Sequence, residues 1–318
     1  MSSSSPHPRP SPRAREIVRG GYDLHVHSGP DVMPRSAHDL EIAARLRDVG
    51  MNGYVIKHHY AGSAGRARLA SAAVPGVDVM GSIVLNSAVG GMNAMAVEMA
   101  ARDGARVVWF PTVDAENEPA GRVDPAPGAK LPFWAKLQHQ LRAEGLHSRP
   151  VPVVDESGAV LPEVVDVLRT IARHDLILAT AHLGRDEIFT VVEAARAHGV
   201  ERIVITHPEF PSQNLAVDDQ IELARMGALL ERCITTPLTG KCTWERIIDA
   251  IRTVGPEHSL LSSDLGQPEN PPVEDGIALW ADALLEAGVA ERDVRTMAVE
   301  TPWALARGTW KAAERARR

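Results

Sequence analysis

Eight short apolar segments, each followed by an amphipathic helical pattern, recur along this chain of 318 residues. Alternation of strands and helices indicates a parallel sheet, and eight such repeats are the number that closes a (β/α)8 TIM barrel. A doubly wound open sheet is the competing architecture, but no Gly-x-Gly-x-x-Gly motif follows the first segment, so its dinucleotide-binding form loses its main support. The expected strands span residues 22–27, 54–58, 77–85, 106–111, 176–182, 202–207, 233–236 and 259–264.

The same pattern divides the chain into a tail and one domain. Residues 1–19 begin with a stretch rich in Ser, Pro and Arg, which is typical of a disordered tail, and residues 20–318 are expected to form a single barrel. After the fourth strand, a long stretch rich in Pro and Gly spans about 115–158. Loops of this length are usually lids or binding loops. We therefore expect a lid-like insertion over the carboxyl-terminal mouth of the barrel, with a helical insertion that has no catalytic part as the alternative.

Composition narrows the class of partner. The formal net charge of −7 argues against nucleic acid or an anionic membrane as the main partner. Only two cysteines occur, so no disulfide framework is implied and a reducing compartment is expected. No apolar run approaches the roughly 18 residues that span a membrane. We expect a cytoplasmic protein that acts on a small molecule, has no membrane or nucleic-acid partner and assembles as a homo-oligomer.

Residue types that bind metals stand at the ends of four expected strands. His25 and His27 end the first strand, His182 the fifth, His207 the sixth and Asp264 the eighth. The carboxyl ends of parallel strands meet at one rim of a barrel, where the active sites of such barrels are built. A single histidine at a strand end is more often a hydrogen-bonded structural residue, but five such placements in one register indicate a divalent-metal site.

The order His-x-His, His, His, Asp on these strands resembles the amidohydrolase superfamily of metal-dependent hydrolases. Several stretches are similar to one of its bacterial and archaeal branches, a family of unknown function known as DUF6282. The resemblance covers nearly all of residues 20–308 and implies a barrel and a metal site, but it names no substrate. The stretches that carry it are Asp-Leu-His-Val-His-Ser-Gly-Pro-Asp-Val (23–32), Val-Val-Trp-Phe-Pro-Thr (107–112), Ala-His-Leu (181–183), Ile-Thr-His-Pro-Glu-Phe (205–210) and Ser-Ser-Asp-Leu-Gly-Gln-Pro (262–268).

The chemistry implied by this resemblance is hydrolysis of an amide, cyclic amide or lactone bond by water that a metal activates. The cofactor would be one or two divalent ions, with zinc expected and manganese or iron as alternatives. Asp264 would take the proton of the attacking water and pass it to the leaving group. His207 would bind the metal, orient the substrate or stabilise the developing oxyanion.

One position departs from the superfamily's pattern. Binuclear amidohydrolases commonly bridge their metals with a carboxylated Lys, or with a Glu, at the end of the fourth strand. Here that strand runs into Pro111-Thr112-Val113-Asp114, with neither residue at the expected point. Lys57, at the end of the second strand, is instead expected near the metal as a displaced ligand, a charge partner for substrate or a hydrogen-bond donor. This departure favours a site with one metal ion, and a site with two ions is the alternative.

Further residues are expected to line the substrate pocket. Arg35, on the loop after the first strand, can pair with a substrate carboxylate because guanidinium presents a planar fork of donors; a surface arginine that flanks a helix is the alternative. His59 shares the face of Lys57 if the second strand continues, whereas His58 would face the helices. The remaining candidates for substrate binding are Asn86, Asp114 and Trp134.

Other functional classes stay open. A metal-dependent decarboxylase or hydro-lyase of small aromatic or unsaturated acids would use the same kind of barrel with similar ligands. A phosphoesterase of the PHP type would need a richer His/Asp/Glu set than this sequence shows. A non-catalytic barrel that only binds a metal or ligand is disfavoured, because a decayed site would have lost some of the five ligand-type residues.

Overall fold

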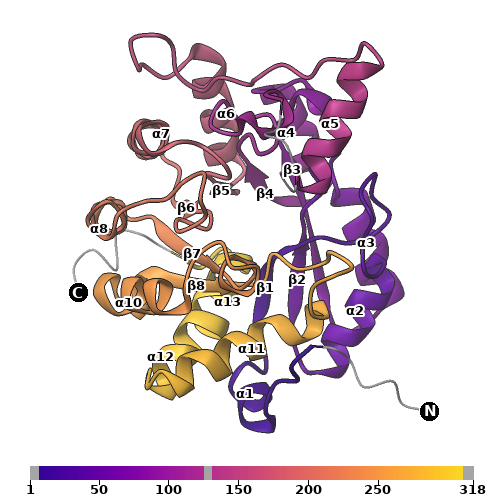
Figure 1. Cartoon of the computed structure of the whole chain (residues 1–318), viewed down its shortest axis with the longest axis vertical. Coiled ribbons are helices and arrows are strands. Elements are labelled where there is room, and N and C mark those ends of the chain that lie inside the picture. The colour runs from indigo at the N-terminus through magenta and orange to yellow at the C-terminus, as the bar shows by residue number, and fades with distance from the viewer. Residues whose placement is uncertain (1–6, 125–130, 311–318) are drawn as a thin grey trace.

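The computed structural model of the chain describes residues 7–124 and 131–310, and it shows eight parallel strands surrounded by helices (Figure 1). The strands lie in the sheet in sequence order, so each one pairs with its neighbours along the chain. This arrangement confirms the predicted (β/α)8 barrel. The strands are β1 (Tyr22–Val26), β2 (Gly53–Ile56), β3 (Asp78–Val84), β4 (Ala105–Trp109), β5 (Ile177–Ala179), β6 (Arg202–Ile205), β7 (Leu229–Cys233) and β8 (Ser259–Ser262).

Helices follow the strands and cover the outside of the sheet (Figure 1). None of the helices in the two described ranges is both long and apolar enough to cross a membrane. They are α1 (Pro12–Ile17), α2 (Asp39–Asp48), α3 (Ala64–Ala73), α4 (Ala94–Arg102), α5 (Phe133–Ala143), α6 (Pro162–Arg173), α7 (Arg185–Ala197), α8 (Val217–Arg225), α9 (Thr235–Leu238), α10 (Trp244–Val254), α11 (Val273–Glu286), α12 (Glu291–Arg295) and α13 (Thr301–Ala306), with the short segments η1 (Ser87–Val89), η2 (Pro119–Gly121), η3 (Pro256–His258) and η4 (Thr296–Glu300).

The barrel closes between β1 and the residues that follow β8. The backbone N–H of Asp264 donates to the carbonyl of His25 over 2.8 Å, and the N–H of His27 donates to the carbonyl of Leu265 over 2.8 Å. The N–H of Ser263 donates to the carboxylate of Asp23 over 3.0 Å. Closure therefore places the first and last of the ligand-type residues in adjacent backbone positions, although some 240 residues separate them in the sequence.

The predicted position of the seventh strand is wrong. Residues 233–236 were expected in the strand, but β7 ends at Cys233 and Thr235–Leu238 forms α9. The strand was missed because two charged residues, Glu231 and Arg232, interrupt its apolar run. Both are buried: Arg232 forms an ion pair with Glu209, and Glu231 lies next to the ring of His25. Partners inside the fold thus replace the apolar pattern that normally marks a buried strand.

The predicted disordered tail is too long. Residues 12–17 form α1, which lies beside α11 (Figure 1). Ser11 caps this helix by accepting from the N–H of Ala14 and anchors it by donating to the carboxylate of Asp282 over 2.6 Å. Ile17, the last residue of this helix, is buried. The Ser-Pro pair at 11–12 is a helix-start signal that the overall composition of the tail obscured, and residues 1–6 of the predicted tail lie outside the described residues.

The predicted insertion at about 115–158 contains two short helical segments. These are η2 and α5, and residues 125–130 between them lie outside the described residues. Gln138 of α5 donates to the carbonyl of Val113 and to the carboxylate of Asp114, over 3.1 and 2.8 Å. The insertion is thereby attached to the loop that leaves β4.

The contact between β3 and α3 allows a test of the packing around the sheet. A Cβ atom added at Gly81 would lie 2.3 Å from Cα of Ala64, whereas one added at Gly65 would meet only the carboxylate of Asp103 at 3.5 Å. We expect Gly81→Ala to destabilise the protein by about 1–3 kcal/mol, because backbone must move to admit the methyl group. Gly65→Ala, at the second position of α3, should change the free energy of unfolding by less than about 0.5 kcal/mol, because its methyl group meets no backbone and lies at a helix end. Urea unfolding measures both, and equal midpoints for Gly81→Ala and the wild-type protein would contradict the packing.

Candidate metal centre

Three side chains meet where the barrel closes. Nε2 of His25 and Nε2 of His27 each lie 3.1 Å from Oδ1 of Asp264. His25 and His27 point the same way because they stand two residues apart along β1. The three ligand atoms all lie within 4.8 Å of one another, which is close enough for them to share one metal ion. Two imidazole nitrogens and a carboxylate oxygen form a donor set that suits zinc and similar divalent ions.

His182 and His207 complete the ring of ligand-type residues. The ring centroid of His207 lies 6.2 Å from that of His25 and 5.0 Å from that of His182. Nδ1 of His207 is buried and has no hydrogen-bond partner among the described residues. On the other ring, Nδ1 of His182 lies 3.1 Å from Oε1 of Glu118. An unpaired buried nitrogen costs free energy unless a ligand satisfies it, so His207 is suited to an ion or a substrate atom.

Burial and charge set the protonation of the site. Burial lowers the pKa of His27 well below its ordinary value, and the positive charge of Arg35 lowers it further. Burial also lowers the pKa of His182 and His207. These three imidazoles are therefore neutral near pH 7, which is the form that binds metals. For Asp264, burial alone raises the pKa, but His25 and His27 outweigh it and hold the pKa well below the ordinary range.

Lys57 reaches the same cluster from the end of β2. Its Nζ lies 3.0 Å from Nε2 of His25 and 4.3 Å from the ring centroid of Trp109. Burial lowers the pKa of its ammonium group, and the nearby carboxylates of Asp264 and Glu231 oppose that change. The structure thus places Lys57 beside His25, and its part in the metal centre stays a prediction.

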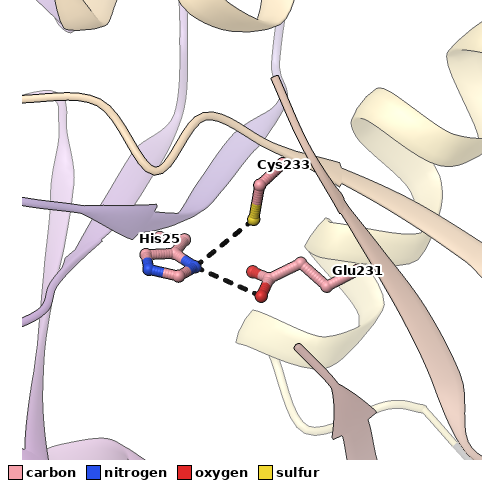
Figure 2. A group of neighbouring side chains, drawn as sticks. All are labelled: His25, Glu231 and Cys233. Atoms are coloured by element: carbon pink, nitrogen blue, oxygen red, sulfur yellow. Dashed lines mark hydrogen bonds and ion pairs between the residues drawn. The ribbon is translucent and has the colours of Figure 1, made fainter. Parts of the chain in front are cut away.

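A second group of side chains holds His25 from the opposite side (Figure 2). Nδ1 of His25 lies 3.2 Å from Oε2 of Glu231 and 3.5 Å from Sγ of Cys233. The ligand atoms of these three residues also lie within 4.8 Å of one another. Burial raises the pKa of the Cys233 thiol well above its ordinary value, so the sulfur is a neutral thiol when no metal is bound. When Glu231 accepts the Nδ1–H of His25, the lone pair of Nε2 is left for a cation that Asp264 would share. Carboxylates orient metal-binding histidines in this way.

Backbone strain gathers at the same strand ends. Ala181, His207 and Asp264 have positive φ values of 53°, 29° and 53°. Residues other than glycine rarely adopt this conformation, and each such residue costs on the order of 1–3 kcal/mol. Strain of this kind is concentrated at functional sites. Here it turns the chain sharply after β5, β6 and β8, so that His182, His207 and Asp264 leave the strands at the mouth of the barrel.

A cavity of about 490 Å³ opens above the cluster. His27, Lys57, His182, His207 and Asp264 line its floor. Three of the predicted substrate-binding residues also line it: Arg35, His59 and Trp134. Trp134 belongs to α5, so the predicted insertion does contribute to the wall of this cavity.

Asn86 and Asp114, the other two predicted substrate-binding residues, do not line this cavity. Asn86 donates to the carbonyl of His59 over 2.9 Å and accepts from the N–H of Thr112. Asp114 accepts from the N–H of Ser87 and from the side chain of Gln138. Both side chains hold loops at the mouth in place, because their hydrogen-bonding groups are taken up by the protein itself. Their prediction as pocket residues is therefore corrected to a supporting position.

Sequence reasoning also missed residues that surround the site. Glu231 and Cys233 stand two apart in an apolar run, as His25 and His27 do, and that spacing is a signal for side chains on one face of a strand. Glu118, which approaches His182, lies in an irregular loop that carries no periodic signal. The other cavity residues not predicted include Phe133, Phe210, Thr235, Lys241 and Gln267.

Comparison with known proteins gives a family and a fold. The profile of a protein family described as "Family of unknown function (DUF6282)" matches residues 20–231. No curated protein sequence matches the chain. Because these comparisons name no substrate, they leave the reaction to be argued from the site.

Similar solved structures share the barrel at low sequence identity. The probable dipeptidase PvdM from Pseudomonas aeruginosa is 13% identical, with a TM-score of 0.61 over 96% of this chain and 100% of that one. An amidohydrolase from Pseudomonas aeruginosa is 11% identical, with a TM-score of 0.59 over 94% and 99%. An organophosphorus hydrolase from Deinococcus radiodurans is 16% identical, with a TM-score of 0.55 over 95% and 99%. At such identities the likeness establishes the fold alone.

The contact between Glu231 and His25 predicts an effect on metal affinity. Replacing Glu231 with Leu removes the acceptor of the Nδ1–H bond, and we expect zinc affinity to fall about 10–100-fold, the usual loss when such a partner is removed. Glu231→Gln retains an acceptor oxygen and should lose much less. Cys233→Ala is the matched control, because the neutral thiol adds little to the orientation of the ring. Isothermal titration with zinc checks this, and wild-type affinity in Glu231→Leu would show that Glu231 does not position His25.

Proposed function

We propose that this protein is a metal-dependent hydrolase of a small molecule. The chain belongs to the family of unknown function DUF6282. The observation that carries the proposal is the meeting of His25, His27 and Asp264. The two imidazole Nε2 atoms each lie 3.1 Å from Oδ1 of Asp264, and His27 and Asp264 line a cavity. Three proteins with the same fold are named as an amidohydrolase, a probable dipeptidase and an organophosphorus hydrolase. Their names support hydrolytic chemistry on this scaffold.

The residues present fit a divalent cation. His25, His27 and Asp264 would hold it, and the neutral rings of His182 and His207, which line the same cavity, are candidates for further ligands. Zinc is the proposed ion, and manganese or iron would accept the same donors. When bound, such an ion polarises a substrate carbonyl and brings the pKa of a water molecule toward neutrality.

Asp264 is placed to move the proton. Its carboxylate is ionised, and its Oδ2 accepts a hydrogen bond from the hydroxyl of Thr235 over 3.0 Å, which fixes the orientation of the group. As the oxygen of water bonds to the carbonyl carbon, Asp264 accepts the proton that the water loses. It then donates that proton to the leaving nitrogen or oxygen as the scissile bond breaks.

His207 and Lys57 can act on the charge that develops during the reaction. The unpaired Nδ1 of His207 and the Nζ of Lys57 both belong to side chains that line the cavity. A donor already in place where negative charge appears on the carbonyl oxygen lowers the barrier, because it needs no reorganisation. We propose these two residues as candidates for that role, with an amide, cyclic amide or lactone as the bond that is cleaved.

Asp264→Asn tests the proton-transfer role. The amide has nearly the same shape but cannot accept the proton, so hydrolysis should fall about 10²–10⁴-fold, the usual contribution of a general base. The assay follows acid release from a panel of lactones, hydantoins and N-acyl amides. Asp186→Asn, at the start of α7, is the matched control and should retain activity.

Two outcomes would contradict this assignment. Activity that survives Asp264→Asn would show that another group takes the proton. Release of carbon dioxide from carboxylic acids in the same screen, without hydrolysis, would favour a decarboxylase over a hydrolase.

Removing the metal should lower the thermal stability of the protein, and zinc should restore it more effectively than magnesium. A ligand that binds only the folded state stabilises it by about 4 kcal/mol when its concentration is 1,000 times the dissociation constant. Zinc added to chelator-treated protein should therefore raise the thermal unfolding midpoint by several degrees. Magnesium should have little effect, because it prefers oxygen ligands. His147→Ala, away from the cluster, should respond to zinc like the wild-type protein, and a wild-type midpoint that zinc does not change would exclude a metal site.

A further inference from the structure

The cavity above the cluster carries more positive than negative side chains. Among the described residues that line it, four are cationic and two, Asp264 and Glu269, are anionic. The whole chain has a formal charge of −7, so the balance among these lining side chains differs in sign from that of the whole protein, and a bound divalent ion would add positive charge. Its cationic side chains are Arg35, Lys57, Lys136 and Lys241.

Arg35 is the cation that is built into the wall. Its side chain is only 5% exposed, and its Nε donates to Oδ2 of Asp31 over 2.7 Å. Asp31 is itself fully buried and lies 3.2 Å from Nε2 of His58. The chain from His58 through Asp31 to Arg35 holds the guanidinium in one orientation.

This guanidinium keeps hydrogen-bonding capacity that the described protein does not use. Nη2 of Arg35 is buried and forms an ion pair with Oδ2 of Asp31 over 2.7 Å, but it donates no hydrogen bond within the described protein. Nη2 carries two N–H groups, so the one turned away from Asp31 is open to an acceptor. An acceptor supplied by a ligand in the cavity would satisfy this donor.

The other walls suit a flat apolar body. The ring of Phe210 lies 4.8 Å, centroid to centroid, from that of His207, and the ammonium group of Lys241 lies 4.6 Å from the Phe210 centroid. Phe133 and Trp134 add aromatic surface from α5. Aromatic side chains bury flat rings well, whereas the exposed Lys241 at the rim is suited to attracting an anion from solvent.

We propose that the substrate of this site is a small carboxylic acid with a ring or other flat body, and that Arg35 binds its carboxylate. The inference rests on the proposed hydrolase function and adds the class of substrate. The carboxylate pairs with the free edge of the Arg35 guanidinium, whose planar donors match two oxygen atoms. The flat body lies against Phe210 and Trp134, and the scissile bond reaches the cluster of His27, His207 and Asp264.

Binding of benzoate and benzamide, two probes that differ in charge but hardly in shape, tests the proposal. Isothermal titration is made with chelator-treated and with zinc-loaded protein, and zinc affinity is measured separately for every variant. We expect benzoate to bind at least tenfold more tightly than benzamide. Arg35→Gln should still bind zinc, should leave benzamide binding unchanged and should reduce benzoate affinity at least tenfold. Arg185→Gln, an arginine at the same mouth that pairs with Asp219 outside the cavity, is the matched control.

The outcomes separate the two claims. Equal benzoate affinity in Arg35→Gln and the wild-type protein, with zinc still bound, would overturn this inference and leave the proposed function standing. Binding of benzoate through Arg35 in a protein that takes up no zinc would support this inference and overturn the proposed function. Inorganic phosphate is the third probe. If Arg35→Gln weakened the binding of phosphate but not that of benzoate, the carboxylate assignment would be overturned.

A measurement on the wild-type protein covers the case in which Arg35→Gln does not fold. Arg35→Lys keeps the positive charge but has no arginine Nε–H group. The signal that this variant loses, in spectra of protein labelled with ¹⁵N-arginine, is therefore that of Arg35. Benzoate should shift that signal and benzamide should not. An Arg35 signal that benzoate leaves in place would overturn the proposal.

Discussion

The interior of this barrel is arranged around one buried imidazole that interacts with carboxylates on both sides. Nδ1 of His25 faces Glu231, and its Nε2 faces Asp264. Charges taken out of water cost several kcal/mol each unless they are paired and hydrogen-bonded. The chain Glu231–His25–Asp264 supplies these partners, and β7, β1 and the turn after β8 must hold their register to form it. A cation bound by His25, His27 and Asp264 would offset the negative charge of the two carboxylates, which is why the site is suited to a metal.

The mouth of the barrel is strained, whereas its wall is closely packed. Positive φ values at Ala181, His207 and Asp264 place the metal-binding side chains but cost free energy in the folded state. Close backbone contact, such as that of Gly81 with Ala64, occurs instead in the wall of the barrel, where helices pack against strands. Stability gained in the wall therefore supports a mouth whose geometry serves binding.

Much of this arrangement follows from the sequence, for identifiable reasons. The barrel and the positions of His25, His27, His182, His207 and Asp264 could be predicted because each follows an apolar run and parallel strands end at one rim. The register of β7 could not, because Glu231 and Arg232 look like surface residues until their partners are known. Asn86 and Asp114 were misplaced because strand-end position does not reveal that a side chain binds its own loops. The approach of Glu118 to His182 depends on an irregular loop, which no periodic pattern describes.

The most direct test of the central claim is the anomalous scattering of zinc in crystals of the protein. The account predicts a strong peak within about 2.0–2.2 Å of Nε2 of His25 and His27 and of a carboxylate oxygen of Asp264, the usual zinc–ligand distances. A peak between Glu231 and Cys233 instead, or no peak at either group with zinc in excess, would contradict it.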